Sequence, residues 1–227
     1  MKFSESRELI LFAAIGALYI ASEPLRPYPL HYVLKAVPIF ILLQFIRTRV
    51  QGPLRIQAQL ALLFSAGGDI MLSMAFPNQF IAGLSSFLVA QLIYGYLFLQ
   101  LRSSSRSTPK IAITACTVGF AVVMANLLLL EAPALRIAVL CYLTVISAMA
   151  IAATWAWRSS LLHVFGAFMF ICSDALIAWN MFRSPVPFSS FFIMSTYYAA
   201  QLMLVTGILR LWMELRPHQT GGAADAS

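Results

Sequence analysis

The sequence predicts an all-α fold, a polytopic membrane helix bundle with eight transmembrane helices. Two observations support this prediction. Of the 227 residues, 61% are hydrophobic and only 10% are charged, whereas charged residues make up about 25% of soluble domains. The apolar residues also gather in runs of about 20, the length of an α-helix that crosses the hydrocarbon core of a bilayer.

The predicted spans end where proline or charge interrupts an apolar run, because these residues disfavour a continuing membrane helix. Such breaks occur at Glu23-Pro24 and Pro77-Asn78. The first run is followed by a poor signal-peptide cleavage site, so we expect a retained helix there. The eight predicted spans are residues 7–22, 31–48, 56–74, 79–100, 110–130, 134–157, 161–182 and 188–213.

We expect one eight-helix domain over residues 1–216 and a disordered cytoplasmic tail over residues 217–227. With an even number of spans, both termini lie on one side, which collects eleven Lys and Arg residues against three on the other. Because positive charge marks the cytoplasmic side, the predicted orientation is N-in and C-in. An error of one in the span count would move the C-terminus across. The same bias predicts a bacterial inner membrane and no role in binding nucleic acid.

Two pairs of predicted spans carry similar short sequences. "SAGGD" ends at Asp69 and is followed one helix later by Ala-Gln91-Leu, while "FICSD" ends at Asp174 and is followed by Ala-Gln201-Leu. The separations from Asp to Gln are 22 and 27 residues. This similarity predicts two parallel four-helix repeats, with chance similarity between apolar segments as the alternative. Parallel repeats also occur in membrane transporters, so the similarity of the two pairs does not define a function.

Asp69 and Asp174 are the acidic residues that fall in the interior of the predicted spans, away from their ends, and we predict that both are catalytic. An ionised Asp at the centre of a membrane helix costs roughly 2.5–3.5 kcal/mol, so it usually marks a functional site. Both lie about 13 residues from the cytoplasmic end of their span, or roughly 20 Å at 1.5 Å per residue. The alternative is a structural pair between Asp69 and Lys35.

Other polar side chains are expected at the same depth, around a wet cavity that opens outward or into the outer leaflet. For the tyrosines the alternative is an interfacial aromatic belt, and for the glutamines it is hydrogen bonding between helices. The alternative for Lys35 is snorkelling to the headgroups. The predicted substrate-binding residues are Lys35, Gln91, Tyr94, Tyr142, Asn180, Tyr197, Tyr198 and Gln201.

The sequence predicts no metal and no cofactor. Its three histidines lie at segment ends or in the tail, and its three cysteines fall inside apolar segments, where we expect them to be small core residues. No HExxH, CxxC, GxSxG or phosphate-binding glycine loop is present. A zinc enzyme, a serine hydrolase and a nucleotide-binding enzyme are therefore all disfavoured.

Two neighbouring carboxyl groups in a medium of low dielectric constant do not ionise alike: one keeps its proton while the other is charged. Such a pair supplies a general acid and a general base, and it suits reactions through an oxocarbenium-like cation. A proton-coupled transporter of small molecules or lipids is the alternative, because alternating access could also use one acid in each half.

Four segments, "FSAGGDIML", "FLVAQLIY", "GAFMFICSDALIAWNMF" and "YYAAQLML", resemble the YhhN family, which includes the lysoplasmalogenases of animal membranes. The resemblance extends from Lys35 to Gln201. It implies a membrane hydrolase that cleaves the vinyl ether bond of lysoplasmalogens, or of a related lysolipid, to a fatty aldehyde and a glycerophospho-headgroup. The implied partners are a lysophospholipid substrate and the lipid bilayer. For such a reaction we expect one of Asp69 and Asp174 to be the acid and the other the base, and the sequence does not say which.

Overall fold

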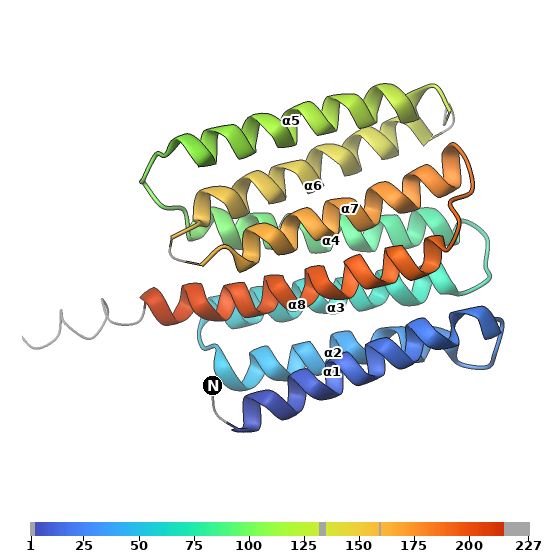
Figure 1. The fold of residues 1–227 in the computed structure, drawn as a ribbon, viewed down its shortest axis with the longest axis horizontal. Helices are drawn as coiled ribbons and strands as arrows, with labels where there is room; N and C mark the ends of the chain where they lie inside the picture. The colour runs from blue at the N-terminus through green and yellow to red at the C-terminus, as the bar shows by residue number, and fades with distance from the viewer. Residues whose placement is uncertain (1–2, 132–134, 159, 216–227) are drawn as a thin grey trace, which may run out of the picture.

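The computed structural model describes residues 3–131, 135–158 and 160–215, and over these residues the chain is a bundle of long helices without strands (Figure 1). Each of the eight α-helices coincides with a predicted span, and no boundary differs by more than four residues. The all-α prediction is confirmed, whereas the predicted tail over residues 217–227 lies outside the described residues. The helices are α1 (Phe3–Ser22), the 3-10 helix η1 (Glu23–Leu25), α2 (His31–Arg49), α3 (Pro53–Ser73), α4 (Gln79–Gln100), α5 (Thr108–Leu129), α6 (Arg136–Ala156), α7 (Leu162–Phe182) and α8 (Ser189–Leu215).

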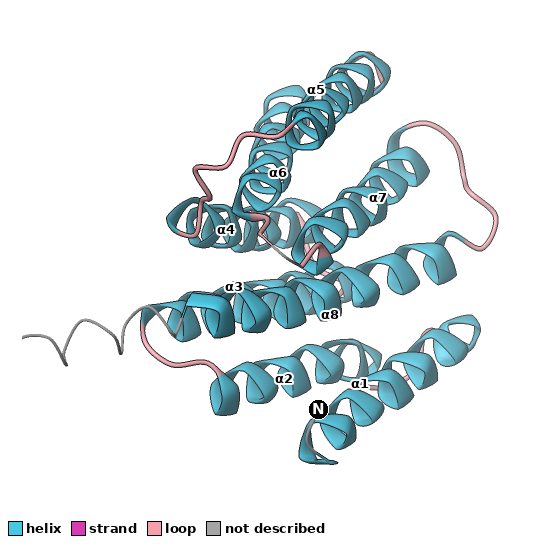
Figure 2. Cartoon of the chain, turned by 60° about the vertical axis from the view of Figure 1, so that its left-hand side comes forward, coloured by secondary structure: helices cyan, strands magenta, loops and turns pink. Residues whose placement is uncertain are grey.

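Consecutive helices run in opposite directions, so their connections alternate between two ends of the bundle (Figure 1). The end on the left of Figure 1, here called the terminal end, holds the start of α1 and the end of α8. The opposite, distal end holds the α1–α2, α3–α4, α5–α6 and α7–α8 connections. The helices α1 and α2 lie on one side, α5 and α6 lie on the other, and the helices that carry the two aspartates lie between them (Figures 1 and 2).

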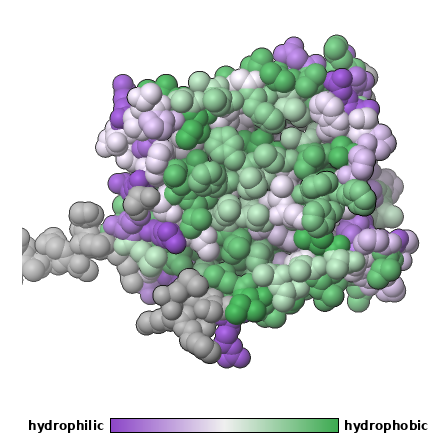
Figure 3. Space-filling model, viewed as in Figure 1, coloured by the Kyte–Doolittle hydropathy of each residue, from purple (hydrophilic) through white to green (hydrophobic). Residues whose placement is uncertain are grey.

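The face of the bundle seen in Figure 3 is apolar across its middle and more polar toward its two ends. Seven helices of the described chain are long and apolar enough to cross a membrane, which indicates an integral membrane protein. The remaining long helix, α3, has 21 residues but includes Gln57, Gln59 and Asp69. The count of eight spans and the orientation therefore stay predictions. The expectation that the three cysteines are core residues is wrong, because all three are exposed.

The closest helix pairs are α3 with α4 and α7 with α8, and glycines permit both approaches. A Cβ atom on Gly68 would lie 2.5 Å from the Phe87 ring, and one on Gly166 would lie 2.8 Å from the backbone nitrogen of Leu204. Small residues let membrane helices approach closely. Each aspartate-bearing helix is thereby packed against a glutamine-bearing helix, which agrees with the predicted repeat without establishing it.

Candidate functional site

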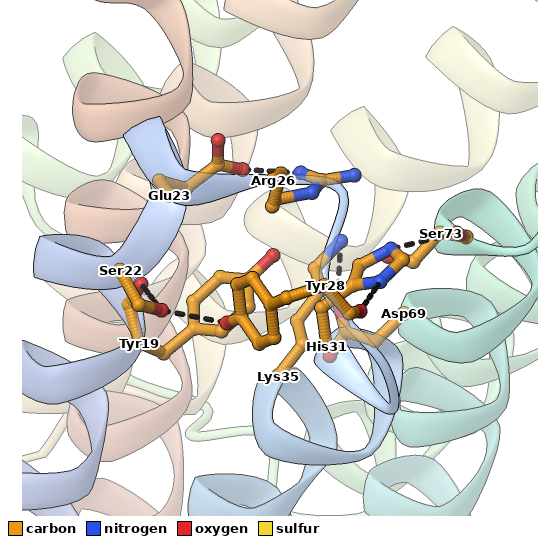
Figure 4. Close-up of polar contacts among 9 residues, drawn as sticks. All are labelled: Tyr19, Ser22, Glu23, Arg26, Tyr28, His31, Lys35, Asp69 and Ser73. Carbon is orange, nitrogen blue, oxygen red and sulfur yellow. Dashed lines mark hydrogen bonds and ion pairs between the residues drawn. The ribbon is translucent and has the colours of Figure 1, made fainter.

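Asp69 lies in the distal half of α3, and both of its carboxylate oxygens have partners. It is only 1% exposed. The Lys35 ammonium on α2 is 3.3 Å from Oδ1, and the Tyr197 hydroxyl on α8 donates a hydrogen bond to Oδ2 at 2.6 Å. Lys35 and Asp69 face one another beneath the distal loops (Figure 4). The cation and the phenol offset the cost of burying a carboxylate, so the structural pair with Lys35 that the sequence left open does form.

Asp174 has different surroundings. Its Oδ2 accepts a hydrogen bond from the Tyr142 hydroxyl on α6. No lysine or arginine in the described part of the chain forms an ion pair with it. Asp174 is also partly exposed, since it lines a cavity. The two carboxyl groups lie close enough for their charges to interact, so the fold brings the two predicted catalytic residues together.

The cavity beside Asp174 is apolar and lies between α3, α4, α5, α6 and α7. Of the described residues that line it, only Tyr142 and Asp174 have polar side chains. Phe120 lines it too and is 38% exposed, so the cavity reaches the apolar surface of the bundle. A hydrocarbon chain could enter it from a bilayer. The apolar lining residues are Leu72, Phe80, Leu84, Phe87, Phe120, Met124, Leu128, Val139, Leu143, Ile146, Ile171, Ala175, Ile177, Ala178 and Phe182.

Two glutamine side chains lie beside the tyrosines that contact the aspartates. The Gln91 amide approaches the Tyr142 hydroxyl and the Gln201 amide approaches the Tyr197 hydroxyl, in both cases without the geometry of a hydrogen bond. The Tyr94 hydroxyl donates to Gln201 Oε1 at 3.0 Å. Both glutamines are fully buried. Buried polar groups usually have partners, so an unpaired amide at this position suits a bound water or substrate.

An aromatic cluster fixes the Tyr197 ring. The centroid of this ring lies 5.8 Å from that of Phe87 and 5.6 Å from that of Phe170, both in edge-to-face arrangements. Phe87 in turn occupies the space above Gly68. The glycines before Asp69 therefore serve helix packing, and this packing positions the phenol that binds the aspartate.

Two of the predicted substrate-binding residues make contacts of another kind. The Tyr198 hydroxyl donates to the backbone oxygen of Lys35 at 2.8 Å, which ties α8 to α2. Asn180 is exposed, and its side-chain oxygen accepts a hydrogen bond from the Val186 amide at 2.9 Å within the α7–α8 connection. None of the hydrogen bonds between described residues joins Asn180 to either aspartate.

Sequence reasoning missed a second polar cluster at the distal end, just beyond Lys35 and Asp69 (Figure 4). His31 contacts two backbone oxygens, that of Tyr28 through Nδ1 at 2.9 Å and that of Ser73 through Nε2 at 3.1 Å. Arg26 pairs with Glu23 beside it. One signal was available: His31 precedes Lys35 by four residues, a spacing that places both on one helix face.

These features define a class, a polytopic helical membrane protein with two aspartates inside its helix bundle, each bound by a tyrosine, and an apolar cavity beside one of them. The chain belongs to the YhhN family, which matches residues 30–208. The resemblance that the motifs indicated is thereby confirmed.

The similar curated proteins are named lysoplasmalogenases. Lysoplasmalogenase TMEM86A of Bos taurus is 31% identical over 186 residues, which cover 76% of this chain and 75% of that protein. Lysoplasmalogenase TMEM86B of Rattus norvegicus is 34% identical over 154 residues, covering 66% and 60%. The human TMEM86B is 30% identical over 184 residues, covering 78% and 75%. No solved structure matches the chain.

Proposed function

We propose that this protein is a membrane-embedded hydrolase that cleaves the vinyl ether bond of lysoplasmalogens, or of a related lysolipid. The products would be a fatty aldehyde and a glycerophospho-headgroup. The names of its relatives support this substrate class. The observation that carries the proposal is the position of Asp174, which lies in the wall of an apolar cavity and within range of the charge of a second aspartate.

The two aspartates have different roles in this proposal because their surroundings differ. Asp174 borders hydrocarbon-like side chains and has no cationic partner among the described residues. A carboxyl group in such surroundings favours its neutral form and can act as a general acid. Asp69 lies beside the Lys35 ammonium, which favours the carboxylate. Asp69 is therefore the base and the group that stabilises a positive charge.

The reaction then proceeds in three steps. Asp174 gives its proton to the β-carbon of the vinyl ether, whose double-bond electrons form the new C–H bond and leave an oxocarbenium ion. Asp69 takes a proton from water as the water oxygen bonds to the α-carbon, forming a hemiacetal. Asp174 then accepts the hemiacetal hydroxyl proton while Asp69 protonates the departing glycerol oxygen. One water is consumed, and both carboxyl groups return to their starting states.

The tyrosines and glutamines position these groups. The Tyr142 and Tyr197 hydroxyls orient one carboxyl group each. The unpaired amide atoms of Gln91 and Gln201 would hold the attacking water near the two phenols, and Tyr94 fixes the Gln201 oxygen. The apolar cavity would take the alkenyl chain, which keeps the double bond beside Asp174.

The test is aldehyde release from lysoplasmenylethanolamine by the purified protein in detergent, with the variants Asp69→Asn and Asp174→Asn. We expect aldehyde from the wild type and a loss of roughly a hundredfold or more in each variant, the scale of a lost general acid or base. Glu131→Gln, which neutralises an exposed acid, is the matched control. Full activity in either Asp variant would contradict the two-acid mechanism, and no aldehyde from the wild type would contradict the substrate.

A further inference from the structure

We propose that the distal polar cluster of Glu23, Arg26 and His31 is a binding pocket for the zwitterionic phosphate-and-ammonium headgroup of the lysolipid. The pocket is called the headgroup pocket below. Its assignment to a lipid rests on the proposed function, but its chemistry is read from its own residues. The site is separate from the aspartates and from the apolar cavity.

The headgroup pocket opens at the distal end, between the α1–α2 connection, the start of α2 and the end of α3. Its polar lining comes from Glu23, Arg26, His31, Tyr32 and Ser73. It therefore offers charged groups and hydrogen-bonding groups together at one opening, in contrast to the apolar cavity beside Asp174. Such a lining suits a charged, water-soluble group rather than a hydrocarbon chain.

The headgroup pocket lies directly beyond Lys35 and Asp69, toward the distal end (Figure 4). His31 is one helical turn before Lys35 on α2, and Ser73 is one turn after Asp69 on α3. Leu72, the neighbour of Ser73, lines the apolar cavity. The end of α3 thus borders both spaces. A lysolipid could place its chain in the cavity, its ether beside the aspartates and its headgroup in the pocket.

The charges of the headgroup pocket complement such a headgroup. Both acceptors around His31 are carbonyl oxygens, and a neutral imidazole can donate through only one nitrogen. At least one of the two contacts is therefore a hydrogen bond that the ring donates, and together they hold the imidazole in the wall of the headgroup pocket. Arg26 uses one guanidinium nitrogen for Glu23, and the remaining donors of its planar fork match the oxygens of a phosphate. The Glu23 carboxylate is then placed for the ammonium of an ethanolamine or choline group.

The decisive experiment compares Arg26→Gln with the wild type on two vinyl ethers, lysoplasmenylethanolamine and 1-O-alkenylglycerol, which lacks the phosphate. For the phospholipid we expect KM to rise roughly tenfold or more with little change in kcat, since a charge-assisted hydrogen bond is lost. For alkenylglycerol we expect the variant and the wild type to be equal. Arg183→Gln is the matched control, because Arg183 is also at the distal end but stacks on Trp179 outside the pocket.

Binding of 1-O-alkyl lysophosphatidylethanolamine, which has no vinyl ether bond, separates this inference from the proposed function. We expect it to raise the unfolding temperature of the wild type more than that of Arg26→Gln. If the ligand stabilises the wild type more than Arg26→Gln but no aldehyde forms from the vinyl ethers, the headgroup pocket is supported and the hydrolase proposal is contradicted. An equal loss on both vinyl ethers, or none on either, would overturn the headgroup pocket. Equal stabilisation by inorganic phosphate alone would overturn its assignment to a lipid headgroup.

Discussion

Asp69 and Asp174 end similar short motifs on α3 and α7 but lie in different surroundings. Asp69 is enclosed, with a lysine on one oxygen and a tyrosine on the other. Asp174 has one tyrosine and faces an apolar cavity. The helices that precede α3 and α7 contribute to this difference. Lys35 on α2 precedes Asp69 by 34 residues, and Tyr142 on α6 precedes Asp174 by 32. Similar motifs thus acquire different chemistry from what the neighbouring helix supplies.

The largest effect is expected from Lys35→Met, which removes the feature that most distinguishes the two aspartates. Breaking a buried ion pair leaves an uncompensated charge and costs about 3–5 kcal/mol. We expect a lower unfolding temperature in detergent and little aldehyde release. The double variant Lys35→Met with Asp69→Asn should regain stability but not activity, because the buried charge is gone and so is the base. Wild-type stability in the single variant would show that the lysine does not hold Asp69.

The next largest effect is expected from removing the tyrosine hydroxyl that contacts each aspartate. Tyr142→Phe removes the hydrogen bond that the structure gives to Asp174, whereas Asp69 keeps Lys35 in Tyr197→Phe. In the proposed mechanism Asp174 becomes a carboxylate as it gives up its proton, and a hydrogen bond to a charged group contributes about 1.5–3 kcal/mol. We therefore expect kcat to fall roughly ten- to a hundredfold in Tyr142→Phe and less in Tyr197→Phe. Tyr96→Phe, at a residue that is 61% exposed, is the control. A larger fall in kcat for Tyr197→Phe than for Tyr142→Phe would contradict the assignment of Asp174 as the acid and Asp69 as the base.

The helices were predictable because apolar length and breaks at proline or charge are local properties. The pair of Lys35 with Asp69 was also foreseeable, since few other residues can offset a buried carboxylate. Asn180 was grouped with the site by depth along its helix, but depth does not say which way a side chain points, and this one caps a loop. The apolar setting of Asp174 depends on how five helices pack, which no short motif records.

The smallest effect concerns the cavity that sets Asp174 apart. Ala178 lines it, and Ala178→Leu would occupy space that the alkenyl chain needs. We expect KM to rise several-fold for long-chain lysoplasmalogens and less for short-chain ones, because one methylene in an apolar pocket is worth about 1–3 kcal/mol. Ala115→Leu, on the exposed face of α5, is the matched control. A loss that is equal for all chain lengths would indicate disturbed helix packing instead. Unchanged kinetics would indicate that the alkenyl chain binds outside this cavity. The apolar surroundings of Asp174 would then not be explained by chain binding.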